Sequence, residues 1–252
     1  MIRLLFVVAA VAWAGQAMSA EIGAKWVKDS DYQICFKAAR DNPKEGHRFA
    51  GVWRDNGGGA PADHCHALAM LGLGYYQEAA QRLESLAERF AGEDPALAVE
   101  LHGQAANAWS LAAKPERARA AQAAAIKLRP DDVDILIDRS VTLVSLGAFW
   151  DAVDDLNRAI DLAPKRADVL ALRASAYRRL ETLDLAEDDI TRALALEPGH
   201  PDALLERGIL RRLKGDAAGA RRDWLAVVRS GGDTPTADAA RDQLQRLDMK
   251  AP

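Results

Sequence analysis

Residues 133–166 read VDILIDRSVTLVSLGAFWDAVDDLNRAIDLAPKR, and the next 34 residues, 167–200, read ADVLALRASAYRRLETLDLAEDDITRALALEPGH. When the two segments are aligned, both carry a small residue, an alanine, an aliphatic residue and a proline at the same places. The same interval of 34 residues separates Pro130, Pro164 and Pro198. A period of this length predicts an array of small stacked units rather than one closed core.

Five units follow this period. They begin at Ala60, Val99, Val133, Ala167 and Pro201. The first unit has about five extra residues in its closing loop, over residues 90–98. Alanine and leucine dominate the composition while runs of valine and isoleucine are rare, which favours helix over sheet. We therefore expect each unit to be a pair of helices.

Small residues recur where the two helices of a unit would cross. The second helix of each unit opens with an alanine, namely Ala79, Ala118, Ala152, Ala186 and Ala220. The first helix carries a small residue opposite it, namely Ala67, Ala106, Ser140, Ala174 and Gly208. The break between the helices carries Gly74, Lys114, Gly147, Glu181 and Gly215. Antiparallel helices joined by a tight turn approach closely only where side chains are this small.

This pattern resembles the tetratricopeptide-repeat family, whose 34-residue helix–turn–helix unit has the same small residues and proline. The resemblance implies an all-α, right-handed superhelical solenoid. It covers residues 60–234, as five repeats over 60–98, 99–132, 133–166, 167–200 and 201–234. The unit at Val99 departs most, because Lys114 replaces the turn glycine and Gln122 stands where a large apolar residue belongs.

The two ends lie outside the repeat. Residues 21–59 predict a further helical hairpin, in which Ser30 caps a helix over 31–40 and Pro43 separates it from a second helix. Residues 235–252 predict a capping helix and tail, since an end repeat needs a polar outer surface.

Residues 1–20 have the layout of a secretory signal peptide. Arg3 precedes an apolar run over 4–14, and small residues follow at Gly15, Ala17 and Ser19. A retained membrane anchor is the alternative, but the run is shorter than the roughly 20 residues that a spanning helix needs. We expect export to the periplasm as a soluble protein, without a membrane span in the mature chain.

The chain has two cysteines, Cys35 and Cys65. In an oxidising compartment two thiols usually pair. We expect a structural disulfide between the leading hairpin and the first repeat.

Charged residues follow the repeat at a fixed spacing. Three arginines each precede an aspartate by sixteen residues: Arg139 and Asp155, Arg173 and Asp189, Arg207 and Asp223. We interpret them as ion pairs inside each hairpin, the alternative being a ladder of arginines that binds anions.

No motif indicates catalysis, a cofactor or a metal. The triplet Gly57–Gly59 lacks the following Gly-Lys-Ser/Thr of a phosphate loop. The string Asp63-His64-Cys65-His66 has ligand types, but adjacent helical residues point about 100° apart and do not close one tetrahedral site. A net charge of −4 does not indicate nucleic-acid binding. We therefore expect that the protein is not an enzyme.

The remaining candidate is a binding surface. In the tetratricopeptide-repeat family the first helix of every unit lines a concave groove. The corresponding residues here are Leu68, Asn107, Ile137, Val141, Val144, Ser175, Arg178, Leu205, Ile209 and Arg212. The middle of this set is apolar and its late part is basic, which suits an amphipathic helix or extended apolar segment with acidic flanks. The sequence thus predicts a scaffold or adaptor for a peptide or protein partner. The alternatives are a self-assembling structural module and a thiol- or metal-handling accessory protein that uses Cys35, Cys65 and nearby histidines.

Overall fold

The computed structural model describes Trp26 and residues 28–249, so the predicted signal peptide lies outside the described residues. The described residues form thirteen helices and no strand, which confirms the predicted all-α class. The chain divides between Leu146 and Gly147 into two compact units. Each unit is described by itself below.

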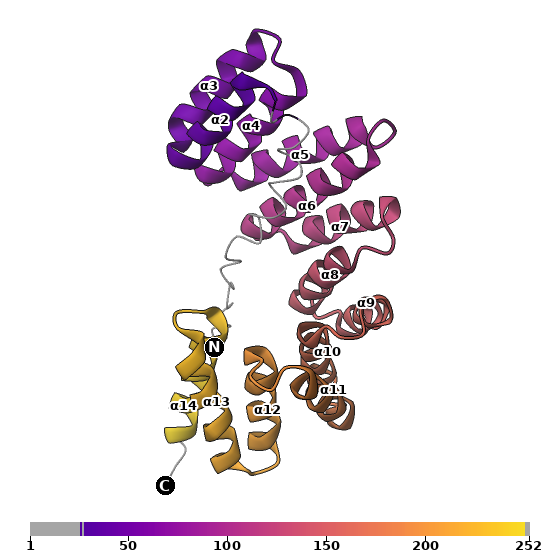
Figure 1. The fold of residues 1–252 in the computed structure, drawn as a ribbon, viewed down its shortest axis with the longest axis vertical. Helices are drawn as coiled ribbons and strands as arrows, with labels where there is room; N and C mark the ends of the chain where they lie inside the picture. The colour runs from indigo at the N-terminus through magenta and orange to yellow at the C-terminus, as the bar shows by residue number, and fades with distance from the viewer. Residues whose placement is uncertain (1–25, 27, 250–252) are drawn as a thin grey trace. The chain divides into compact units, whose positions relative to one another are not determined.

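In the unit that ends at Leu146, each helix packs against the next one along the chain, and α2 also packs against α4 (Figure 1). Its helices are α2 (Ser30–Asp41), α3 (Pro43–Asp55), α4 (Gly59–Gly72), α5 (Tyr76–Phe90), α6 (Pro95–Leu111), α7 (Pro115–Leu128) and α8 (Val133–Ser145). Its main core runs from Trp26 and Tyr32 through Leu83 and Leu101 to Trp109.

In the unit that begins at Gly147, successive helices form a second stack. Its helices are α9 (Phe149–Leu162), α10 (Ala167–Arg179), α11 (Leu183–Leu196), α12 (Pro201–Leu213), α13 (Ala217–Gly231) and α14 (Pro235–Asp248). Helix α12 contacts α10, the first helix of the preceding hairpin, and it also contacts the last helix, α14. The last helix, α14, covers a core made of Leu204, Ala220, Trp224, Val227 and Ala240. The unit is therefore a run of hairpins closed by one further helix.

Prolines and left-handed residues set the ends of the helices. Helices α7, α9 and α11 each end two residues before a proline of the repeat, as expected because a proline disfavours helical geometry in the residue before it. The left-handed turn residues are Gly74, Ala113, Gly147, Glu181 and Gly215, with φ between 55° and 86°. The assignment of Lys114 to this turn was wrong: Ala113 lies 34 residues before Gly147 and has a φ of 55°.

Helix α6 begins earlier than the repeat suggests. The extra residues expected to form a loop over 90–98 instead give a short turn and one additional turn of helix, since α6 starts at Pro95. Asp94 caps this helix by accepting a hydrogen bond from the amide of Leu97 at 3.0 Å, and Pro95 occupies the first helical position. Both residues favour a helix start. The helix therefore begins at these residues and not at Val99, where the 34-residue period would place its start.

The small residues of the crossings are buried in every repeat hairpin. At Gly208 on α12, an added Cβ would lie 2.3 Å from the indole nitrogen of Trp224 on α13. Trp224 is fully buried and donates a hydrogen bond to the carbonyl of Leu205 at 3.1 Å. A side chain at position 208 would therefore overlap with a tryptophan that has no room to move.

The leading hairpin is joined covalently to the first repeat. Cys35 on α2 and Cys65 on α4 form a disulfide, and both residues are fully buried. Closing a loop of this length removes roughly 3 to 4 kcal/mol of chain entropy from the unfolded state. The cap of α2 is Asp29 rather than Ser30, because its carboxylate accepts hydrogen bonds from the amides of Asp31 and Tyr32 at 2.9 and 3.2 Å.

A buried histidine links three helices beside the disulfide. Nδ1 of His64 lies 2.9 Å from the hydroxyl of Tyr32 on α2, and Nε2 lies 2.8 Å from Oε1 of Gln104 on α6. Because that amide oxygen only accepts, Nε2 carries the proton and Nδ1 accepts from the Tyr32 hydroxyl. The ring of Trp26 lies 5.2 Å from the imidazole. Burial lowers the pKa of His64 from 6.5 to about 4, so the neutral ring is part of the folded structure.

We expect this histidine to make the fold sensitive to acid. The unfolded chain binds a proton at His64 near pH 6.5 while the folded chain does not, so stability is complete above that pH. It should fall by about 3 kcal/mol as the pH is lowered towards 4. The pKa values of His66 and His102 are also lowered by burial, so His64→Gln should lose only part of the wild-type dependence of stability on pH. Urea unfolding at a series of pH values measures the free energy of unfolding of the wild type and His64→Gln. If this free energy changed equally with pH in both proteins, a neutral, buried His64 would be contradicted.

Candidate functional site

The predicted groove residues of the unit ending at Leu146 differ in exposure. Leu68 is half-buried against the core, whereas Asn107 on α6 is exposed. On α8, Ile137 and Val144 are half-buried, and between them Val141 is 50% exposed. These three residues lie four and three positions apart, so they form one stripe along the helix. This α8 stripe, Ile137, Val141 and Val144, is an apolar surface on a first helix.

A carboxyl group borders the α8 stripe. Asp138 follows Ile137, and its pKa is raised to about 6. The side chain of Asp138 is nevertheless exposed to solvent, and the charges of Asp134 and Asp132 repel it. A cationic group placed against the stripe would offset this repulsion.

In the unit that begins at Gly147, the predicted groove residues are partly engaged in packing and ion pairing. Leu205 and Ile209 pack against the core beneath α14, and Ser175 is half-buried. Arg178 binds Glu206 on the next first helix, with nitrogen–oxygen distances of 2.6 and 3.1 Å. The expectation of a basic late groove therefore does not hold at Arg178. For Arg212, the buried Nε atom has no hydrogen-bond partner among the described residues.

Two of the three predicted ion pairs lie inside hairpins of this unit. Arg173 donates to both carboxylate oxygens of Asp189 at 2.7 Å and to the side-chain oxygen of Asn157 at 2.7 Å. Arg207 donates to both oxygens of Asp223 at 3.0 and 2.8 Å. Both aspartates are buried, so these pairs fix the register of the helices, and removing one partner would leave a buried charge.

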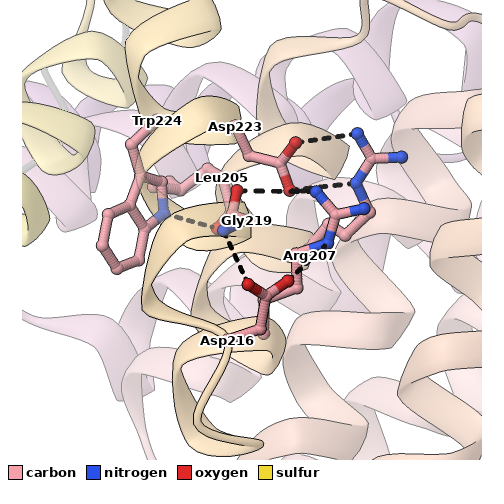
Figure 2. A network of polar contacts seen from close by, with 7 residues as sticks. Leu205, Arg207, Asp216, Gly219, Asp223 and Trp224 are labelled. Atoms are coloured by element: carbon pink, nitrogen blue, oxygen red, sulfur yellow. Dashed lines mark hydrogen bonds and ion pairs between the residues drawn. The ribbon is translucent and has the colours of Figure 1, made fainter.

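Figure 2 shows the Asp223 pair at the centre of a larger network. A second arginine, Arg211, also donates to Asp223 at 2.7 Å, and Asp216 caps α13 through the amide of Gly219 at 2.8 Å. The indole of Trp224 lies on the adjoining side and reaches the carbonyl of Leu205. Asp223 thus binds two of the three arginines of α12, Arg207 and Arg211, which favours a structural role over an arginine ladder that is open to anions.

The third predicted pair joins different units. Arg139 lies on α8 and Asp155 on α9, on the two sides of the division at Leu146. Their pairing stays a prediction.

Sequence reasoning missed the contacts that cross between hairpins. The Arg178–Glu206 pair has a spacing of 28 residues, which joins the end of one first helix to the middle of the next. Such a spacing has meaning only once the stacking of neighbouring first helices is known. The second arginine on Asp223 was also missed, although the sequence carries a signal for it. Arg211 lies one helical turn after Arg207, on the same face of α12.

No set of three or more histidine, cysteine, aspartate or glutamate side chains in the described part of the chain is placed to hold a metal ion. Neither cysteine is a free thiol. None of the helices over 28–249 has the length and apolar character needed to cross a bilayer.

Comparison with known proteins places the fold. No protein-family model matches the sequence, and no curated protein does. Among solved structures, MamA residues 41 to the end from Desulfovibrio magneticus RS-1 is 21% identical, with 73% of this chain and 97% of that chain covered and a TM-score of 0.55. PilF from Pseudomonas aeruginosa is 19% identical over 75% of this chain and 92% of that chain, with a TM-score of 0.55.

A third solved structure is described by its type of repeat. YrrB, a TPR protein with an unusual peptide-binding site, is 17% identical over 76% of this chain and 96% of that chain, with a TM-score of 0.52. At such identities the likeness concerns the backbone and not the site residues. Together with the buried small residues and the stacked hairpins, these neighbours show that the chain has the tetratricopeptide-repeat fold.

Proposed function

We propose that this protein is a non-catalytic scaffold or adaptor that holds a peptide or protein segment against the first helices of its hairpins. The α8 stripe carries the proposal. Val141 exposes half of its surface between Ile137 and Val144. Burying these side chains against a partner would contribute roughly 25 cal/mol per Å² of apolar surface removed from water.

The chemistry around the stripe defines the partner. Apolar side chains on a helix surface are typical of grooves that receive an amphipathic helix or an extended apolar segment. Asp138 at the edge of the stripe has a raised pKa, so a basic residue that follows the partner's apolar side chains would pair with it. Asn107 on α6 is exposed and offers both a donor and an acceptor to a peptide backbone. The peptide-binding site named for YrrB supports this use of the fold.

In the unit that begins at Gly147, Arg212 is the proposed contact for an acidic group. Its Nε atom has no hydrogen-bond partner among the described residues, whereas Arg178 is already neutralised by Glu206. Ser175, Leu205 and Ile209 would provide the half-buried surroundings. We assign these residues to the same function, as a second contact surface.

We further propose that the protein works outside the cytosol, in the periplasm or cell envelope. The leader-like sequence of residues 1–20 supports this location. So does the buried disulfide between Cys35 and Cys65, since such bonds form and persist in oxidising compartments. Because both sulfurs lie in that buried bond, we favour a structural role for Cys35 and Cys65 over thiol handling.

A single charge in the stripe tests the proposal. Val141→Glu should reduce the amount of partner captured from a native cell-envelope extract by about tenfold or more, because a buried carboxylate opposes apolar contact. Val52→Glu is the matched control: Val52 is 54% exposed on α3, outside the first helices of the repeats. Captured proteins are quantified for the wild type and both variants.

Two outcomes would overturn the assignment. Equal capture by Val141→Glu and the wild type would show that the α8 stripe does not bind the partner. Loss of helical circular dichroism in Val141→Glu, with Val52→Glu unaffected, would show that Val141 is needed for the core.

A further inference from the structure

Basic side chains gather where α3, α4 and α5 meet, away from the first-helix residues discussed above. Arg54 and His47 lie on α3, His66 lies on α4, and Arg82 and Arg89 lie on α5. The imidazole rings of His47 and His66 have their centres 4.3 Å apart. One guanidinium nitrogen of Arg54 lies 3.4 Å from Nδ1 of His66. We refer to these five residues as the basic cluster.

The carboxylates that contact the cluster are too few and too distant to neutralise its three arginines. Asp63 divides its two oxygens between Arg82, at 3.5 Å, and Arg89, at 3.1 Å. Asp55 lies 3.4 Å from Arg54. Charge-assisted pairs are normally about 2.7 to 2.9 Å long, and Arg173 reaches Asp189 at 2.7 Å in this same chain. Three arginines therefore share two loosely held carboxylates.

Hydrogen-bond donors in the cluster also lack acceptors. Nε of Arg82 is buried and has no hydrogen-bond partner among the described residues. Because a guanidinium only donates, Nδ1 of His66 must accept from Arg54, and the proton of the neutral ring sits on Nε2. The cluster thus presents N–H groups from three helices and an excess of positive charge.

The ionisation of these groups reflects the same imbalance. The pKa of Arg82 is lowered, first by burial and then by Arg54, while Asp63 opposes the shift. The pKa of His66 is lowered to about 4 by burial, then by Arg82, His47 and Arg54, again with Asp63 opposing. An added anion would reverse the repulsive part of both shifts.

We propose that the basic cluster is a binding site for a phosphate-type oxyanion. A phosphate has enough oxygens to accept from Arg54, Arg82 and His66 together, and guanidinium groups bind phosphate oxygens through two parallel hydrogen bonds. Arg54 and Arg89 keep about a third to a half of their side chains exposed, so the anion has access from solvent. The site is separate from the α8 stripe, and neither proposal depends on the other.

The test uses the intact chain and inorganic phosphate at neutral pH, with ionic strength held constant by sodium chloride. The ring signals of His47 and His66 should shift saturably in nuclear magnetic resonance spectra. Arg54→Gln and Arg82→Gln should each raise the Kd about tenfold or more. Arg119→Gln removes the same charge from an exposed pair with Glu116 on α7, and it should leave the Kd unchanged. Glycerol phosphate in parallel shows whether free or esterified phosphate binds more tightly.

Asp63→Asn provides a result that a purely structural cluster would not give. The substitution keeps all three arginines and removes the carboxylate that competes with the ligand, so phosphate should bind more tightly. It also separates binding from folding if Arg82→Gln fails to fold. The proposal is overturned if the histidine signals do not saturate with phosphate, if Arg119→Gln weakens binding as much as Arg82→Gln, or if Asp63→Asn binds no more tightly than the wild type.

Discussion

The helices of this chain lie so close at their crossings that a single added methyl group has no room at Gly208. Its Cβ would lie 2.3 Å from the indole nitrogen of Trp224 and 2.7 Å from the neighbouring ring carbon. The leading hairpin has a similar approach, since a Cβ at Gly46 would lie 2.5 Å from the backbone of Ala39. In the other repeat hairpins that lie within one unit, alanine takes this place and is buried. Close approach lets a pair of short helices exclude water with few large side chains.

Because the hairpins are thin, the first and last hairpins of the chain each need a further element to cover their apolar face. A hairpin this thin buries its remaining apolar face only against its neighbours, so the ends need special closure. At one end the disulfide and the His64 network join α2 to α4 and α6. At the other end α14 covers the last core. Between the ends, Val141 on α8 keeps half of its surface exposed between the half-buried Ile137 and Val144.

The residues that repeat along the chain were predictable from the sequence, and the residues that join one repeat to another were not. The prolines, the buried alanines and the pairs Arg173–Asp189 and Arg207–Asp223 depend only on the geometry inside one hairpin, which a 34-residue period specifies. The turn at Ala113 was misplaced by one residue because Lys114-Pro115 has no glycine to mark it. His64 is fully buried between Tyr32 and Gln104, and the basic cluster combines residues from three helices. These contacts follow from stacking, which local spacing does not encode.

The fold depends on the close crossing of α12 and α13, and a double-mutant cycle at Gly208 and Trp224 measures that packing most directly. Alanine is favoured over glycine inside a helix by about 1 kcal/mol, so Gly208→Ala would stabilise a loosely packed pair. The account predicts that it destabilises the wild type by about 1 to 3 kcal/mol, as overpacked cores do. It also predicts that the same substitution becomes neutral or stabilising in a Trp224→Leu background, measured by urea unfolding. Stabilisation of the wild type by Gly208→Ala, or an equal cost in both backgrounds, would contradict it.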